Sequence, residues 1–149
     1  MEAWPSFLRA QGMNFRDILK AQLPTDEGYR KKPYRDTVGK LTIGIGRNLD
    51  DVGVNDGEIQ LMLDNDIERA VIVASRVVPT FETLSDMRKA VVCNMAFNMG
   101  ERVFGGFHDT LQAIAEERWD DAADHMLQSR WASQVGARAA RLAQAMRDG

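Results

Sequence analysis

The spacing of apolar residues predicts a short helix, then an extended segment, and then helices to the end of the chain. Residues 14–22 (NFRDILKAQ) place Phe15, Ile18 and Leu19 at helical spacing, so we expect a short helix with these side chains facing inward. Pro24 should end this helix, because proline lacks the backbone N–H that helical hydrogen bonding requires and disfavours helical geometry at the preceding residue.

Beyond Tyr34 the period of the pattern becomes two. Apolar residues alternate there with a threonine and two glycines, namely Leu41, Ile43 and Ile45 with Thr42, Gly44 and Gly46. This alternation predicts a half-buried strand, preceded by a turn at residues 38–40. We expect Thr42 to lie with the glycines on the open face, where a ligand can approach the backbone closely.

Helical spacing then returns. Asn55 and Glu58 have the spacing of a helix-capping box, and the helix they begin should extend to Pro79. Ser85 should begin a second apolar helix that closes near Gly100. Further helices are expected at residues 108–117, 119–129 and 136–147.

These elements predict an α+β fold dominated by helices, with two lobes. The small lobe, about residues 24–58, contains the hairpin, and the larger helical lobe comprises about residues 80–149 together with the N-terminal helix. A long helix should join the lobes, with a cleft between them. We expect residues 14–149 to form a single domain and residues 1–13 to be an N-terminal extension.

Composition narrows the class of protein. The 149 residues are 44% hydrophobic and 28% charged, which is typical of one globular domain. A net charge of −3 argues against nucleic acid as a partner. No apolar stretch reaches membrane-spanning length, so we expect no stable membrane insertion. We further expect the protein to be a monomer.

Neither the cysteine nor the histidines indicate a cofactor. Cys93 is the only cysteine and lies in an apolar run, so it predicts an inert core thiol and no intrachain disulfide. Two histidines provide no metal-binding set, and we expect neither a metal nor another cofactor. The single cysteine and the lack of an apolar signal core predict synthesis in a reducing cytoplasm, and a substrate outside the cytoplasm would require another factor to deliver the protein.

Glu27 and Asp36 are the candidate reacting groups. Glu27 precedes Gly28, where the helical stretch gives way, and Asp36 lies at the entrance to the hairpin. Hydrolysis of a glycosidic bond requires one carboxyl group that donates a proton and a second that is ionised. We expect Glu27 to be the partly buried acid and Asp36 the ionised partner. The Thr42 hydroxyl could hold a water beside Asp36, which would favour inversion.

A solvated charged surface is the alternative interpretation of this segment. On spacing alone, a glutamate and an aspartate nine positions apart are more often surface groups with weak ion pairs. The longer string around them favours the catalytic interpretation.

Three blocks of sequence carry a resemblance to a known family. They are Asp26-Glu27-Gly28 with Tyr34-Arg35-Asp36-Thr37 and residues 42–46 (TIGIG), then residues 94–101 (NMAFNMGE) with Gly106-Phe107, and then Arg118-Trp119-Asp120, Ser129-Arg130-Trp131 and Arg138-Ala139. In order and spacing the chain resembles the phage-type lysozymes, glycoside hydrolase family 24, from about Asn14 to Leu142.

The resemblance implies an N-acetylmuramidase, which hydrolyses the β-1,4 bond between N-acetylmuramic acid and N-acetylglucosamine in peptidoglycan. It implies that Glu27 is the general acid, that Asp36 is the second carboxylate and that Thr42 helps to position water. The positions that contact the saccharide in the family correspond to Asn48, Phe97, Thr110 and His125. The arginine that pairs with the catalytic acid in the family corresponds to Arg138.

The resemblance further implies a bacteriolytic endolysin of a phage or prophage. Such an enzyme is made in the host cytoplasm and reaches the periplasm and cell wall through a separate holin-type pore. A lytic transglycosylase, a catalytically silent peptidoglycan-binding module and a virion-associated lysozyme domain are the alternatives. Two departures from the family pattern bear on the site, namely Arg47 in place of a histidine and Pro24 just ahead of the acid.

Overall fold

The computed structural model describes residues 12–149, which divide into two compact units. The first unit ends at Ile59 and the second comprises Gln60–Gly149. The predicted extension, residues 1–13, lies almost wholly outside the described residues.

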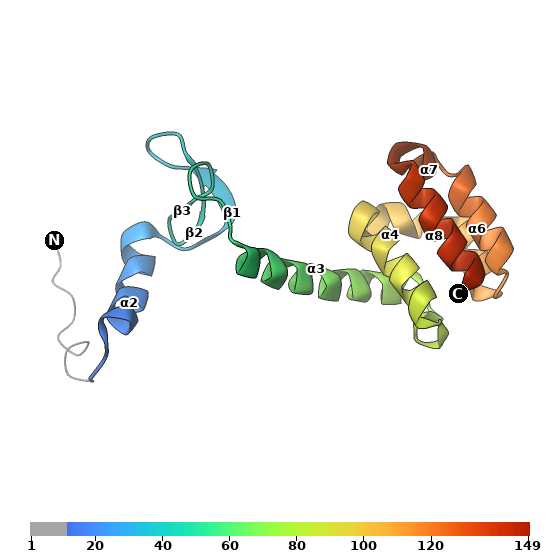
Figure 1. Ribbon diagram of the computed structural model, residues 1–149, viewed down its shortest axis with the longest axis horizontal. Coiled ribbons are helices and arrows are strands. Elements are labelled where there is room, and N and C mark those ends of the chain that lie inside the picture. The colour runs from blue at the N-terminus through green and yellow to red at the C-terminus, as the bar shows by residue number, and fades with distance from the viewer. Residues whose placement is uncertain (1–11) are drawn as a thin grey trace. The chain divides into compact units, whose positions relative to one another are not determined.

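Helices dominate both the element order and the second unit (Figure 1). The elements are α2 (Phe15–Glu27), β1 (Arg30–Arg35), β2 (Leu41–Gly44), β3 (Arg47–Asn48), α3 (Asp56–Val77), the 3-10 helix η1 (Phe81–Thr83), α4 (Asp86–Gly105), α5 (His108–Ala115), α6 (Trp119–Gln128), α7 (Arg130–Val135) and α8 (Ala137–Asp148). The predicted α+β class is therefore confirmed.

Helix α2 is longer than the sequence predicted. It continues through Pro24 to Glu27, so the prediction that Pro24 ends it was wrong. The proline removes a single hydrogen bond close to the end of the helix, and the Gly28 N–H donates to the Pro24 carbonyl at 3.1 Å to close the last turn. No residue of α2 is buried, and Phe15 is 65% exposed, so the first unit alone does not give the expected inward orientation.

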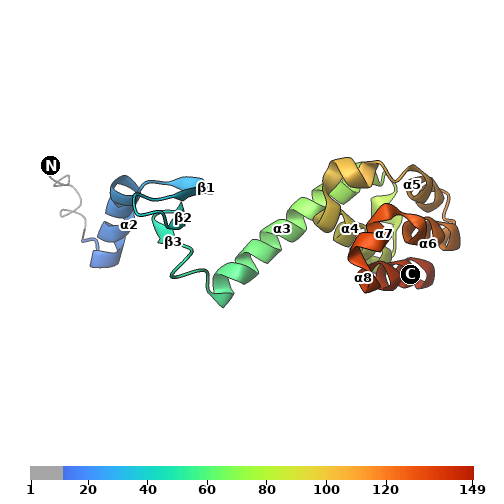
Figure 2. The same ribbon diagram turned by 90° about the horizontal axis from the view of Figure 1, so that it is seen from above.

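The three strands form an antiparallel sheet in the order β1-β2-β3 (Figure 2). The register of β1 is irregular between Arg30 and Tyr34, the stretch that contains Pro33. Such a proline is tolerated because β1 is an edge strand, where a missing N–H costs no ladder bond. The predicted strand is confirmed as β2, and the turn before it lies where the sequence placed it.

The two faces of β2 differ from the prediction. Thr42 is only 3% exposed, Leu41 and Ile43 are half-buried, and Ile45 is 41% exposed in the turn that follows. Thr42 occupies the middle strand, opposite Tyr34 on one side and Asn48 on the other. Neighbours on both sides cover it, and a hydrogen bond to a backbone carbonyl satisfies its hydroxyl, so its burial carries little cost.

Local capping signals were accurate. The Glu58 N–H donates to Asn55 Oδ1 at 2.9 Å and the Asn55 N–H donates to Glu58 Oε2 at 3.0 Å, which confirms the capping box. Ser85 caps α4 as predicted. The helix that Ser85 begins breaks at Gly100 (φ 78°, ψ 171°), close to the predicted end, and a second helical segment counted within α4 continues beyond this kink to Gly105.

The second unit has its own packed core. Its largest fully buried side chains come from the segment between α3 and η1 and from helices α4, α5, α6 and α8. They are Val78, Val91, Val92, Met95, Phe104, Ile114, Met126 and Met146. The three C-terminal helices that the sequence predicted are α5, α6 and α8, whereas α7 was not predicted. Within residues 12–149 no helix combines the length and apolar character needed to cross a bilayer.

Glu117 is the residue whose replacement should stabilise the fold. Its φ of 56° is in the left-handed region. The next residue, Arg118, donates its N–H to the Ala113 carbonyl, so α5 ends in a Schellman motif in which Glu117 occupies the position that favours glycine. We expect Glu117→Gly to raise the free energy of unfolding by about 0.5–1 kcal/mol, because the strain relieved exceeds the entropy cost of glycine. Urea unfolding measures this, and Glu117→Ala, which keeps the strain, should show no gain. A Glu117→Gly protein less stable than Glu117→Ala would contradict the assignment.

Candidate active site

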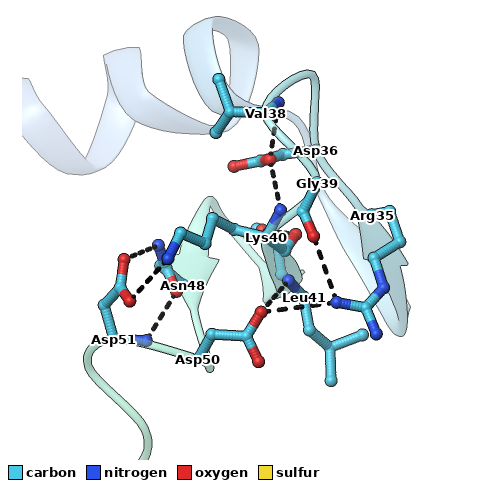
Figure 3. A network of polar contacts seen from close by, with 10 residues as sticks. Arg35, Asp36, Val38, Gly39, Lys40, Leu41, Asn48, Asp50 and Asp51 are labelled. Atoms are coloured by element: carbon cyan, nitrogen blue, oxygen red, sulfur yellow. Dashed lines mark hydrogen bonds and ion pairs between the residues drawn. The ribbon is translucent and has the colours of Figure 1, made fainter.

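The carboxylate of Asp36 is held by the main chain of the β1–β2 turn (Figure 3). Asp36 Oδ1 accepts hydrogen bonds from the Val38 N–H at 3.0 Å and from the Lys40 N–H at 2.8 Å. The Asp36 N–H donates to the Lys40 carbonyl at 2.9 Å, and the Gly39 N–H donates to the Asp36 backbone carbonyl at 3.0 Å. Aspartate favours such turns because its short side chain reaches the N–H groups two to four residues ahead. Asp36 Oδ2 has no hydrogen-bond partner among the described residues of the first unit, so one oxygen is anchored there and the other is available.

Thr42 is tied to the same main-chain position. Its Oγ1 donates to the Lys40 carbonyl at 3.0 Å, which leaves the oxygen lone pairs as acceptors. The Lys40 main chain therefore contacts both Asp36 and Thr42. No sequence pattern distinguishes Lys40 for this role, because its contribution comes from backbone atoms that every residue type possesses.

Glu27 is the last residue of α2 and lies against the turn between β2 and β3. A Cβ atom placed on Gly46 would be 2.9 Å from Glu27 Oε2 and 3.0 Å from Glu27 Cβ. Gly46 was predicted to allow a ligand to approach, but here its missing side chain accommodates the candidate acid. The first unit leaves Glu27 exposed, so the partial burial expected from the sequence is not provided by that unit.

Arg47 binds Glu58 and not Asp36. Its two terminal nitrogens donate to the two carboxylate oxygens of Glu58 at 2.7 and 2.6 Å, and Nη1 also donates to the Gly53 carbonyl at 3.1 Å. The Arg47 guanidinium, helped by the Asn55 N–H, lowers the pKa of Glu58 to about 2. The Arg47–Glu58 ion pair therefore links strand β3 to the first turn of helix α3.

Asn48 is the predicted saccharide contact in the first unit. It is half-buried on β3 and in register with Thr42. Its Nδ2 donates to Asp51 Oδ2 at 3.0 Å, and its Oδ1 accepts from the Asp51 N–H at 2.9 Å. Both ends of the amide are thus fixed by a single neighbour.

The remaining predicted residues lie in the second unit, in two separate sets. Thr110, which is 2% exposed, and His125 line one hollow of about 360 Å³. Phe97, which is 50% exposed, lines another of about 390 Å³ together with Asn94 and Arg138. Arg138 donates from Nε and Nη2 to Asn94 Oδ1 at 3.0 and 2.7 Å, and its predicted pairing with the acid stays a prediction.

The comparisons with known proteins agree over most of the chain. Residues 25–147 match the family described as phage lysozyme. The chain is 29% identical over 153 residues to "Probable T4-type lysozyme 2" of Dictyostelium discoideum and 29% identical over 154 residues to "Probable T4-type lysozyme 1" of the same organism. Each alignment covers 83% of this chain and 90% of the relative. It is also 28% identical over 152 residues to the "Pre-baseplate central spike protein Gp5" of Enterobacteria phage T4, covering 83% of this chain and 26% of that protein.

Replacing Gly46 should displace Glu27 without comparable damage elsewhere. Gly46→Ala would place a methyl group in contact with the Glu27 side chain, and we expect at least about a tenfold loss of the peptidoglycan hydrolysis that the resemblance implies. Gly44→Ala is the matched control, because both glycines have φ 68° but a Cβ at Gly44 would meet nothing within 4 Å. Equal losses in the two variants would show that backbone strain, and not contact with Glu27, is responsible.

The Arg47–Glu58 pair should make stability depend on acid pH. Because the folded pKa of Glu58, about 2, lies below its ordinary value, the stabilisation is present above about pH 4.5 and is lost as the pH falls toward 2. We expect Glu58→Gln to lower the free energy of unfolding at pH 7, by an amount that solvent screening of this partly exposed pair keeps small. Urea unfolding from pH 7 to pH 2 should show the difference from wild type shrinking, and a difference independent of pH would contradict it.

Proposed function

The chain belongs to the phage lysozyme family and is a lysozyme-type glycoside hydrolase acting on peptidoglycan, and on this premise we propose that Glu27, Asp36 and Thr42 form its reaction centre. We propose that it cleaves the β-1,4 bond between N-acetylmuramic acid and N-acetylglucosamine. The observation that carries the proposal is that Asp36 is anchored through a single oxygen to the Lys40 main chain, to which Thr42 also bonds, in the same unit as Glu27.

Glu27 acts as the general acid in this proposal. It donates its proton to the oxygen that leaves the anomeric carbon as the bond breaks. One feature of the structure supports the role, since the close contact with Gly46 fixes the Glu27 side chain. The bound saccharide would supply the desolvation that the first unit by itself does not.

Asp36 and Thr42 act on the attacking water. Asp36 Oδ1 is held by two N–H groups, so Oδ2 is the atom that accepts a proton of the water. Because the Thr42 hydroxyl proton is donated to the Lys40 carbonyl, Oγ1 meets the water as an acceptor. Water held by these two acceptors would attack the anomeric carbon from the face opposite the leaving group, which inverts its configuration.

The substrate-binding residues are carried over as proposals. Asn48, Phe97, Thr110 and His125 would contact the saccharide, and Arg138 would support the acid. The shared hollow supports pairing Thr110 with His125, and the exposed ring of Phe97 supports contact with a sugar face. The predicted cleft between the lobes, and the place of the N-terminal helix in the helical lobe, stay predictions.

The biological role that we propose is that of an endolysin. It would be a monomer, made in the cytoplasm of the host of a phage or prophage and admitted to the cell wall through a holin-type pore. The similarity to a phage T4 central spike protein motivates a second candidate, a lysozyme domain carried in a virion. Cells that express the chain and lyse only after their inner membrane is permeabilised would support the endolysin, whereas recovery of the chain in purified virions would support the second candidate.

Glu27→Gln should abolish hydrolysis and leave the fold intact, because it removes the proton donor while preserving size and shape. We expect a loss of at least about 1,000-fold for Glu27→Gln and about 100-fold for Asp36→Asn. Asp26→Asn, which neutralises the exposed neighbour of the acid, is the control and should retain activity. Mass spectrometry of fragments released from purified sacculi measures all three.

The products of the same digestion separate the rival activities. Fragments ending in reducing N-acetylmuramic acid indicate a muramidase, and 1,6-anhydro ends indicate a transglycosylase. Binding to sacculi without release of fragments by the wild-type protein would indicate a catalytically silent module.

A further inference from the structure

The main chain of Lys40 joins the two groups proposed to act on water. Its N–H donates to the Asp36 carboxylate at 2.8 Å, and its carbonyl accepts both the Asp36 N–H at 2.9 Å and the Thr42 hydroxyl at 3.0 Å. A carbonyl oxygen has two lone pairs, so both are engaged. A shift of the Lys40 main chain would therefore move the carboxylate and the hydroxyl together.

The side chain of Lys40 forms an ion pair with the loop that follows β3 in the first unit. Its Nζ donates to Asp51 Oδ1 at 2.9 Å, and the other oxygen of Asp51 accepts from Asn48 Nδ2 at 3.0 Å (Figure 3). In parallel, Asp50 Oδ2 accepts from the Leu41 N–H at 2.8 Å. The loop that follows β3 therefore holds two adjacent residues, Lys40 at the end of the β1–β2 turn and Leu41 at the start of β2.

We propose that the Lys40–Asp51 ion pair is a positioning device for the reaction, which fixes the Lys40 main chain and through it Asp36 and Thr42. The inference rests on the proposed roles of Asp36 and Thr42. Lys40 and Asp51 are positioning residues, since neither would touch the substrate's reacting atoms.

The exposure of the Lys40–Asp51 ion pair indicates that the pair contributes more to positioning the reacting groups than to the stability of the fold. Hydrogen bonding with Asp51 raises the pKa of Lys40, and hydrogen bonding with Lys40 lowers the pKa of Asp51, so both groups are charged at neutral pH. Their side chains are 42% and 55% exposed, and ion pairs this exposed contribute little to folding. Small displacements of a reacting group, in contrast, reduce rates steeply.

Lys40→Met is the principal test, because methionine is unbranched and only one atom shorter, so it keeps the main-chain contacts but removes the ion pair. On soluble, uncross-linked peptidoglycan strands, with reducing ends as the readout, we expect kcat to fall about tenfold and KM to change less than about twofold. The unfolding midpoint should shift by no more than about 4 °C. Lys40→Arg, which can keep the pair, should retain kcat within about twofold.

Two further variants provide controls. Lys32→Met removes an exposed lysine from β1 in the same unit and should leave kcat unchanged. Asp51→Ala should lower kcat as Lys40→Met does, although it also releases Asn48 and can raise KM. The double variant should lose no more kcat than either single variant, because both remove the same contact. Wild-type kcat in Lys40→Met, or losses that add in the double variant, would overturn the inference.

Amide hydrogen exchange gives a readout that does not require activity. The N–H groups of residues 38 and 40, which donate to Asp36, should exchange about tenfold faster in Lys40→Met than in Lys32→Met. Unchanged exchange would overturn the inference even if Asp36→Asn is inactive. Full activity of Asp36→Asn would instead contradict the proposed role of Asp36 in the reaction. The carboxylate that Lys40 holds would then have no part in hydrolysis.

Discussion

The hydrogen bonds that the turn donates to the Asp36 carboxylate are the constraint on which the first unit depends. They close the turn between β1 and β2, and they aim one carboxylate oxygen away from the main chain. Because the Lys40 carbonyl also accepts from Asp36 and Thr42, the turn and the strand beside it are one hydrogen-bonded arrangement. A carboxylate fixed in this way needs little reorganisation when charge develops beside it.

The candidate acid depends on a different part of the same unit. Helix α2 passes through Pro24 and ends at Glu27, and Gly46 leaves the space in which that side chain lies. Glu27 is therefore placed jointly by the end of a helix and by a hairpin turn. The bidentate contact of Arg47 with Glu58 holds the next strand against the first turn of α3, so ion pairs and turns, more than apolar burial, organise this small unit.

The second unit is organised by its core. Buried methionines, valines and Phe104 hold its helices, and the candidate saccharide-binding residues lie in hollows on the surface of that packed scaffold. A division of labour follows from this arrangement. The groups proposed to react lie in the first unit, and most groups proposed to recognise sugar lie in the second, where packing fixes their positions.

The sequence by itself determined the α+β class, strand β2, the caps at Asn55 and Ser85, and the candidate reacting residues, because each depends on residues close together in the chain. Only the tertiary structure decided that Thr42 is buried, that Arg47 binds Glu58, and that Gly46 accommodates Glu27. It also decided that α2 continues through Pro24, since the loss of one bond near a helix end is tolerated when a following glycine closes the turn. These outcomes depend on which residues from separate segments meet and on how neighbouring elements compensate, and no local spacing encodes either.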